Sequence, residues 1–254
     1  MISVVTVCFN DLSGLKTTKE SVLKQGGCDY EWIVVDGGSN DGSADYLSSL
    51  GPQVIFISEP DNGIYDAMRK GLRLASRPYI LFLNAGDEFL NSESLDSAMG
   101  QVGSEDVYFF ATQLEGWAHH YRRTARTLPA ARYSVPAVQQ STIYSTSILR
   151  SLEWPTTYSI CGDFYIAAQL HERRCSWKRS DLVLSRFKIG GISTLAFPRL
   201  CVEAWRIQRD VLHIPAWIRM LFLLRRFCTG AVMFAGYKLR KVLRRVGFAD
   251  TSVA

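Results

Sequence analysis

Three apolar runs near the start of the chain each end in a short polar turn whose side chains can bind a ligand. The runs are residues 2–9, 32–35 and 81–83, and the polar side chains that follow them are Asn10, Asp36 and Asp87. Such runs are typical of buried parallel strands, and open α/β sheets bind ligands beyond the carboxyl ends of those strands. We therefore expect these side chains to meet at one edge of a sheet and to form a polar binding site.

The pattern around these turns predicts the elements that position them. In the first hundred residues, strand-like runs alternate with helical patterns, which indicates parallel strands joined by crossover helices. After about residue 104 this alternation becomes looser. The expected strands are residues 2–9, 32–35, 54–57, 79–83, 107–110 and 182–187, and the expected helices are residues 12–23, 42–50, 63–75 and 163–171. The prediction is an α/β fold whose first half is a nucleotide-binding layer.

The composition indicates a folded protein of the cytoplasm. The chain has 254 residues and is 47% hydrophobic, which supports one large α/β domain, with or without an appendage. Six cysteines are scattered without metal-ligand spacing, and the first strand begins at Ile2 with no signal peptide before it. These features predict free thiols and a cytoplasmic location.

Positive charge is concentrated at the C-terminal end of the chain. Residues 1–198 contain 18 Lys and Arg against 21 Asp and Glu, whereas residues 199–254 contain 11 against 3. From Phe197 onward, tryptophans and leucines alternate with arginines, and residues 238–245 add a basic run. Basic amphipathic helices dock on anionic membranes, so we expect a peripheral protein on the inner face of the cell membrane. A solvated helix face is the alternative, and nucleic acid is not an expected partner.

Four motifs resemble those of the family 2 glycosyltransferases, and within them the bacterial exopolysaccharide and colanic-acid-type enzymes. The motifs are residues 6–10, 33–42, 61–68 and 82–87. Four linked motifs are far more specific than any one alone. The resemblance covers roughly residues 1–195. It implies a GT-A fold with a Rossmann-like, mostly parallel central sheet flanked by helices, a nucleotide-sugar donor, a divalent metal ion and inversion at the anomeric carbon.

The resemblance also predicts how the chain is divided. Residues 1–195 form the glycosyltransferase domain, with a nucleotide-binding half at 1–104 and an acceptor-binding half at 105–195. Residues 196–254 form a C-terminal amphipathic helical extension that carries the basic charge.

Two aspartates take roles that the resemblance implies. Asp36 would bind the base of the nucleotide, because a carboxylate accepts the N–H of a uracil or guanine ring; the alternative is a cap for the helix that begins near Gly42. Asp87 would bind Mg²⁺ or Mn²⁺ at the diphosphate. Since residues 84–87 supply only one carboxylate, phosphates and water would be the other main ligands, with Asn84 nearby. A turn carboxylate bonded to its own backbone is the alternative for Asp87.

The segment around Asp163 resembles the one that supplies the catalytic base of the family. Its expected place at a helix start would lower its pKa and favour the ionised form, and an ordinary helix-terminal carboxylate is the alternative. The resemblance gives the expected nucleotide-sugar-binding residues as Thr6, Asn10, Asp36, Asp66, Arg69 and Asn84. Asp66 and Arg69 lie three residues apart on one helix face, so a solvated ion pair is an equal alternative. Residues 139–140 and 190–193 would contact the acceptor or the donor.

These features predict an inverting, metal-dependent glycosyltransferase at the cytoplasmic membrane face. It would move a single sugar from a UDP- or GDP-sugar to an acceptor hydroxyl, such as that of a polyprenyl-linked oligosaccharide of a surface polysaccharide. A non-catalytic nucleotide-sugar or membrane-binding module of the same fold is the main alternative. A dehydrogenase is disfavoured because no GxGxxG follows the first strand, and a nucleotidyltransferase because no glycine-rich basic loop does.

Overall fold

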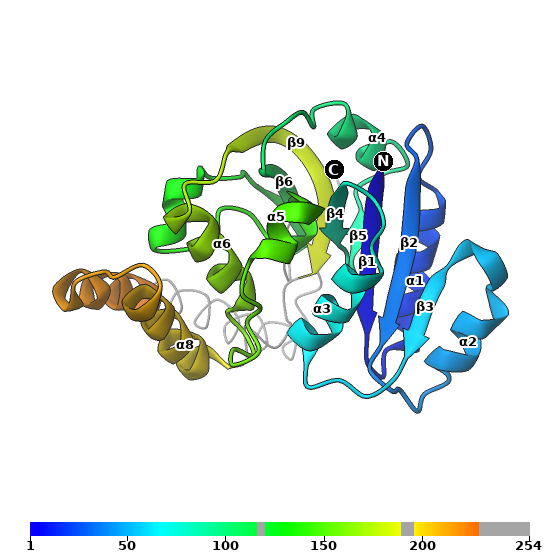
Figure 1. Cartoon of the computed structure of the whole chain (residues 1–254), viewed down its shortest axis with the longest axis horizontal. Helices are drawn as coiled ribbons and strands as arrows, with labels where there is room; N and C mark the ends of the chain where they lie inside the picture. The colour runs from blue at the N-terminus through cyan, green and yellow to red at the C-terminus, as the bar shows by residue number, and fades with distance from the viewer. Residues whose placement is uncertain (116–119, 189–195, 229–254) are drawn as a thin grey trace, which may run out of the picture.

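A β-sheet with helices on both faces forms the centre of the structure, a computed structural model that describes residues 1–115, 120–188 and 196–228 (Figure 1). Within these residues the strand order is β3-β2-β1-β4-β8-β6-β9-β5, and β7 pairs with β6. The strands are β1 Ile2–Cys8, β2 Tyr30–Asp36, β3 Ile55–Ser58, β4 Tyr79–Phe82, β5 Glu88–Phe89, β6 Val107–Glu115, β7 His120–Arg123, β8 Thr142–Ser145 and β9 Trp177–Lys188.

Helices connect and cover these strands. The α-helices are α1 Leu12–Leu23, α2 Ser43–Ser49, α3 Ile64–Leu74, α4 Ser94–Met99, α5 Thr146–Ser151, α6 Gly162–Glu172 and α8 Phe197–Asp210, and residues 216–228 are also helical. The short 3-10 helices are η1 Gly51–Gln53, η2 Leu128–Arg132 and η3 Gln139–Ser141.

The strands predicted for the nucleotide-binding half lie side by side and run parallel. β1 lies between β2 and β4, with Cys8 opposite Asp36 and Val5 opposite Phe82, and β3 pairs with the outer side of β2. Because the carboxyl ends of parallel strands share one edge, the turns after β1, β2 and β4 meet there, as predicted. The helix expected over residues 12–23 is α1, which begins where Asp11 accepts the N–H of Gly14 at 2.9 Å.

The second half of the sheet is mixed. β8 pairs antiparallel with β4 and β6, whereas β6 and β9 pair in parallel. The strands expected at 107–110 and 182–187 are present as β6 and β9, and both are longer than predicted. The α/β class and the GT-A-type arrangement of a central sheet flanked by helices are confirmed.

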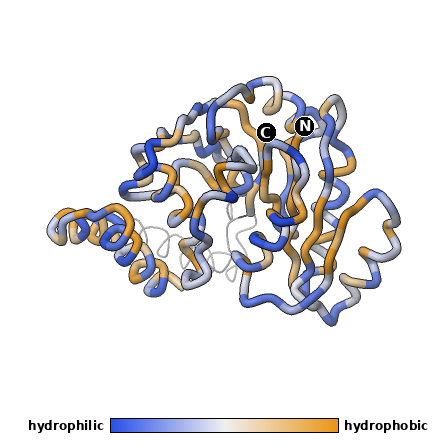
Figure 2. Tube along the Cα trace, in the orientation of Figure 1, coloured by the Kyte–Doolittle hydropathy of each residue, from blue (hydrophilic) through white to orange (hydrophobic). Residues whose placement is uncertain are grey.

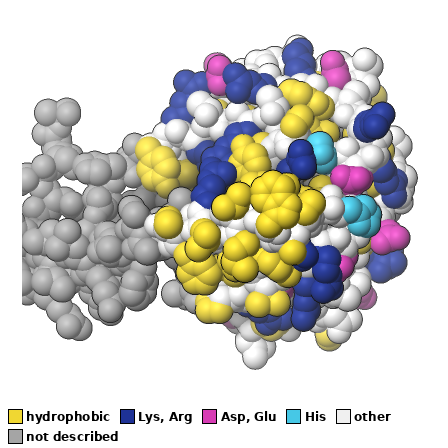
Figure 3. All heavy atoms as spheres, turned by 90° about the vertical axis from the view of Figure 1, so that its left-hand side faces the viewer, with side chains coloured by type: hydrophobic (Ala, Val, Ile, Leu, Met, Phe, Trp, Pro, Cys, Tyr) yellow, Lys and Arg dark blue, Asp and Glu magenta, His cyan; other side chains and the backbone are white. Residues whose placement is uncertain are grey.

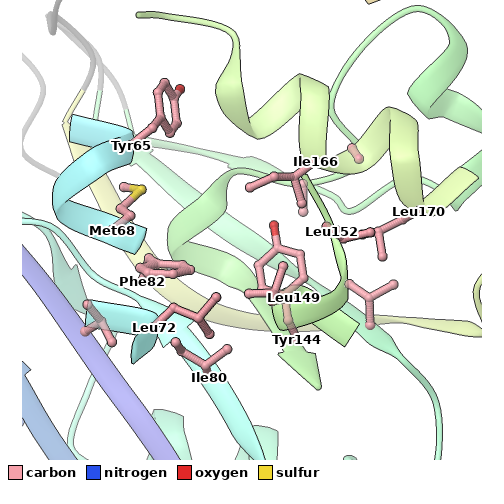
Figure 4. Close-up of a cluster of buried hydrophobic side chains, with 14 of the residues drawn as sticks. Tyr65, Met68, Leu72, Ile80, Phe82, Tyr144, Leu149, Leu152, Ile166 and Leu170 are labelled. Carbon is pink, nitrogen blue, oxygen red and sulfur yellow. The ribbon is translucent and has the colours of Figure 1, made fainter. Parts of the chain in front are cut away.

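Two apolar layers cover opposite faces of the sheet. Alternate side chains of β1 divide between them: Val5 and Val7 belong to the same apolar cluster as residues of α3, α5 and α6, while Val4 and Cys8 belong to the cluster that includes residues of α1, α2 and α4. Figure 4 shows the first layer, where Met68 of α3 and Ile166 of α6 extend toward the same core. Figure 2 shows that the central strands are mostly hydrophobic and that the connections at the rim are more hydrophilic.

The C-terminal helices pack against α6. Phe164 and Ala168 of α6 share a third apolar cluster with Ala204 and Ile207 of α8, and Figure 1 shows α8 beside α6. A helical extension was predicted and is present as far as residue 228; the basic run at 238–245 and the glycine-containing segment at 190–193 lie outside the described residues. None of the helices in the described ranges has the length and apolar character needed to span a membrane.

Candidate active site

Asn10 joins the end of β1 to the turn that follows β2. It has a positive φ of 50°, which Asn tolerates better than most residues. Its backbone N–H donates to Ser39 Oγ at 2.7 Å, and its side-chain Oδ1 accepts the N–H of Asn40 at 2.9 Å. Asn10, which was predicted to bind the nucleotide-sugar, therefore links the two turns through hydrogen bonds.

Asp36 lies at this edge, as predicted, but its side chain is fully buried. Its carboxylate accepts the N–H of Ser39 at 3.0 Å, Ser39 Oγ at 2.5 Å and Ser58 Oγ at 2.7 Å. A buried carboxylate without such donors would be costly. Asp36 does not cap α2, whose N-cap residue is Gly42 and which has no side-chain cap. This arrangement disfavours direct contact between Asp36 and a base, and its hydrogen bonds hold the turn after β2 instead.

The carboxylate of Asp61 lies beside the same turn. A Cβ atom at Gly37 would collide with Asp61 Oδ2 and lie 3.2 Å from the ring of Phe9, so glycine leaves room for this contact. Phe9 is 63% exposed and Asp61 is half-buried. An exposed ring next to a carboxylate suits a nucleobase, which stacks on the ring and donates an N–H to the carboxylate. Sequence reasoning placed Asp61 at the start of the motif 61–68 but did not name it as a binding residue.

The turn that carries Asp87 is hydrogen-bonded to Thr18 of α1. Residues 84–87 form a β-turn in which the N–H of Asp87 donates to the carbonyl of Asn84 at 3.0 Å. Gly86 is the third residue of this turn and has a positive φ of 88°, a conformation that favours glycine. The fully buried hydroxyl of Thr18 accepts the N–H of Gly86 at 3.0 Å and donates to the carbonyl of Asp87 at 2.8 Å. Thr18 was not a predicted site residue, because a threonine inside a helix gives no signal of such a distant contact.

Two oxygen-bearing side chains of this turn fit a divalent metal ion. Asp87 is 8% exposed, and its Oδ2 accepts Gln140 Nε2 at 2.8 Å. Asn84 Oδ1 is buried and has no hydrogen-bond partner among the described residues. Carboxylate and amide oxygens are the ligands that Mg²⁺ and Mn²⁺ prefer. No cluster of three His, Cys, Asp or Glu side chains occurs in the described part of the chain, so a metal here would need phosphate and water oxygens as well.

Thr6, Asp66 and Arg69 are the other residues predicted to bind the nucleotide-sugar. Thr6 is fully buried inside β1, where its Oγ1 accepts Trp32 Nε1 at 3.0 Å, so its side chain is not available to a ligand. Asp66 accepts the backbone N–H of Asn62 at 3.1 Å, at the start of α3. In the described structure it forms no ion pair with Arg69, which is half-buried on the same helix. The predicted alternative of an Asp66–Arg69 ion pair is therefore not what this helix shows.

Asp163 lies in the first turn of α6, as predicted, and its Oδ1 accepts the N–H of Phe164 at 2.7 Å. Burial raises the pKa of Asp163 to about 6, against the opposing effects of that N–H and of the guanidinium groups of Arg123 and Arg226. The expectation that the helix start would lower this pKa was wrong, because loss of hydration outweighs the N-terminal dipole and the two cations. A base with this pKa is still mostly ionised at neutral pH.

Tyr65 of α3 holds the segment that leads into Asp163. Its hydroxyl donates to the carbonyl of Ile160 at 2.9 Å. A Cβ atom at Gly162 would lie 2.5 Å from the Tyr65 ring, so the absence of a side chain at Gly162 lets the ring and the start of α6 approach closely. Helix α3 and the segment with Asp163 are thus in direct contact.

The mostly parallel central sheet flanked by helices is the arrangement of the GT-A glycosyltransferase fold. The chain belongs to glycosyltransferase family 2, because the family described as "Glycosyl transferase family 2" matches residues 3–172.

The curated relatives align with only part of this chain. An uncharacterized glycosyltransferase of Mycobacterium tuberculosis is 42% identical over 103 residues, which are 39% of this chain and 38% of that protein. A glycosyltransferase of PGL/p-HBAD biosynthesis from the same species is 31% identical over 42% of this chain and 43% of its own length. The match therefore spans about four tenths of the length of these relatives.

Solved structures share the fold across most of the chain. Staphylococcus aureus TarS 1–349 in complex with UDP has a TM-score of 0.65 at 16% identity, covering 89% of this chain and 70% of that one. The mannosyltransferase PcManGT from Pyrobaculum calidifontis, in complex with GDP-Man and Mn²⁺, has a TM-score of 0.64 at 12% identity, covering 95% of this chain and 80% of that one. At such identities the likeness shows the fold alone.

Proposed function

We propose that this chain transfers a single sugar from a UDP- or GDP-sugar to an acceptor hydroxyl, with the help of a divalent metal ion and with inversion at the anomeric carbon. The observation that carries the proposal is the turn after β4, where Asp87 lies with Asn84, whose Oδ1 has no hydrogen-bond partner in the described part of the chain, at the edge shared with β1 and β2. Relatives whose solved structures contain UDP, UDP-GlcNAc or GDP-Man support this class of donor.

On the donor side, each residue has a physical role. The exposed ring of Phe9 stacks with the base, and Asp61 accepts an N–H of the base. Asn84 and Asp87 supply oxygen ligands at the diphosphate. A divalent ion, when bound there, neutralises the pyrophosphate and stabilises the departing nucleoside diphosphate.

On the acceptor side, Asp163 acts as the general base. Its carboxylate takes the proton of the acceptor hydroxyl as that oxygen forms a bond to the anomeric carbon and the bond to the diphosphate breaks. Attack from the face opposite the leaving group inverts the configuration. Since burial raises the pKa of Asp163 to about 6, we infer that the rate declines as the pH falls below that value.

The binding part of this proposal is tested by thermal stability against UDP, GDP, UDP-glucose, UDP-GlcNAc and GDP-mannose, each with and without Mn²⁺. A ligand that binds only the folded state raises the Tm by mass action, by about 2.7 kcal/mol of stabilisation at 100 times its Kd. We expect a metal-dependent rise with either the uridine or the guanosine compounds. If none of these ligands changes the Tm, the result would favour the alternative of a non-catalytic membrane-binding module, because a module that binds nucleotide-sugar would still be stabilised.

The exposed side of helix 216–228 supports a membrane-bound acceptor. Five large apolar side chains on it are 49–67% exposed: Trp217, Met220, Leu221, Leu224 and Phe227. Figure 3 shows hydrophobic side chains gathered on this face, with Lys and Arg around them. We propose that this face docks on anionic lipid, which complements the arginines and buries the apolar surface. A putative teichuronic acid biosynthesis glycosyltransferase of Bacillus subtilis among the relatives favours a cell-surface glycan as the product.

Docking by this face predicts that the triple change Trp217→Ser, Leu221→Ser and Leu224→Ser releases the protein from vesicles. Each exposed apolar side chain that enters the lipid boundary contributes up to about 1.5–3 kcal/mol, so binding falls by more than about tenfold. Co-sedimentation with phosphatidylglycerol vesicles measures the effect, with phosphatidylcholine vesicles as the uncharged comparison. Ile55→Ser, at an exposed site on β3, is the control. Unchanged binding of the triple variant would show that this face does not touch the lipid.

A further inference from the structure

Glu203 of α8 forms hydrogen bonds with residues 159–161, the segment that leads into Asp163, the proposed catalytic base. Its side chain is 4% exposed. Oε2 accepts the backbone N–H of Ile160 at 3.0 Å and that of Cys161 at 2.9 Å, and Oε1 accepts the N–H of Ser159 at 3.1 Å and its hydroxyl at 2.9 Å. One carboxylate therefore satisfies three successive backbone donors.

These hydrogen bonds keep Glu203 charged inside the protein. Burial by itself raises the pKa of Glu203, but the donors of Ser159, Cys161 and Ile160 outweigh burial and leave the pKa below its ordinary value. Arg199, one turn earlier on α8, adds a further bond from Nε to Oε1 at 3.2 Å. An anion held in this way is rigid, because moving it would leave several buried donors without acceptors.

Residues 159–161 lead directly into α6, which begins at Gly162. Cys161 is the N-cap residue of α6 and makes no side-chain cap of its own, so the N–H groups before the helix depend on Glu203. Tyr65 holds the carbonyl of Ile160 from the other side. Asp163 follows two residues after Cys161. Contacts from α3 on one side and α8 on the other therefore fix the orientation of the segment that carries Asp163.

We propose that Glu203 is a positioning residue for Asp163, and that α8 thereby completes the catalytic site rather than serving only as a membrane tail. The inference rests on the proposed role of Asp163 as the base. A second contact from the C-terminal helices agrees with it: the Arg226 guanidinium lies 5.5 Å from the ring centre of Phe164, the residue after Asp163.

The test compares Glu203→Gln with Gln208→Ala. Gln keeps the shape of the side chain but puts an amide N–H₂ against backbone donors. Gln208 is equally buried on α8, but bonds to the carbonyl of Arg132 at 3.1 Å and not to residues 159–161. Release of UDP or GDP is measured with whichever of UDP-glucose, UDP-GlcNAc and GDP-mannose gives the largest Mn²⁺-dependent rise in Tm.

For Glu203→Gln we expect kcat to fall about 10–100-fold with unchanged KM for the nucleotide-sugar, because a small displacement of the base costs rate and not donor binding. The pH below which the rate falls should also move, and hydrogen exchange of the 160–164 amides should become faster. Gln208→Ala should lower the Tm without these changes.

Three outcomes would overturn the inference. The first is a wild-type kcat and pH profile in Glu203→Gln. The second is an equal loss of kcat in Gln208→Ala. The third is unfolding of both Glu203→Gln and the charge-preserving Glu203→Asp, which would show that Glu203 serves overall stability. The exchange measurement needs no turnover, so it reports on Glu203 even where the wild-type protein releases no nucleotide. In that case the proposed function would fail separately.

Discussion

Replacing Asp163 with Asn is expected to lower the rate of sugar transfer by about 10²–10⁴-fold, the range that a general base contributes. Asn has nearly the same shape but cannot take the proton of the acceptor hydroxyl. The affinity for the nucleotide should remain within about twofold, since the proposed base and diphosphate contacts lie elsewhere. Steady-state kinetics with isothermal titration of UDP or GDP in the presence of Mn²⁺ would separate the two effects.

The same variant should be more stable than the wild type at neutral pH. Burial raises the pKa of Asp163 from 3.8 in its ordinary state to about 6 in the folded state. Between these two values the folded protein holds a proton that the unfolded chain has released, so wild-type stability falls as the pH rises through this window. Above about pH 6 the loss is complete and on the order of 2–3 kcal/mol.

Urea unfolding at pH 8 and pH 4 tests this pH dependence. Asp163→Asn should exceed the wild type at pH 8 and lose the advantage at pH 4, where the wild-type carboxyl is also neutral. Asp181→Asn is the control, because Asp181 is an exposed carboxylate that forms a surface ion pair with Arg122. Near-normal transfer by Asp163→Asn would remove Asp163 as the base, and an equal gain at both pH values would remove burial as the cause.

Local pattern was sufficient to predict the first half of the fold. The α1 bounds and the parallel strands β1, β2 and β4 follow from apolar runs, caps and turns that lie close together in the sequence. Those strands also made it possible to predict that Asn10, Asp36 and Asp87 share an edge, because strand direction decides which ends meet. The boundary between catalytic domain and tail at residue 196 stays a prediction, although α8 packs on α6.

Long-range contacts explain most of what sequence reasoning missed. The buried position of Asp36 depends on Ser58, 22 residues away, and Gln140 reaches Asp87 across 53 residues. The pKa of Asp163 depends on how deeply α6 is packed, which no local pattern reveals. Glu203 looked like one more charge on an amphipathic helix, and only the fold brings it to residues 159–161. Side chains that act through distant backbone groups therefore need the structure to be found.

Replacing Asp87 with Asn should abolish the metal-dependent part of nucleotide binding. Asn can still accept the hydrogen bond from Gln140 Nε2, so the turn between β4 and β5 should keep its shape. It lacks the charge that attracts a divalent ion beside a diphosphate. We expect the Kd for UDP or GDP in Mn²⁺ to rise at least about 100-fold, since even indirect partners of a metal ligand contribute 10–100-fold.

Three comparisons make the test of Asp87 specific. Titration without metal should give nearly the same weak affinity for wild type and Asp87→Asn, because only the metal-dependent part is lost. Gln140→Leu, which removes one donor to Asp87 but leaves the charge of Asp87, should weaken nucleotide binding in Mn²⁺ about tenfold, less than Asp87→Asn. Asp61→Asn should weaken binding with and without Mn²⁺ alike, since the proposed bond to the base needs no metal. If Asp87→Asn binds nucleotide in Mn²⁺ as well as the wild type, the metal would have to be held by other residues, and the turn after β4 would not be the donor site.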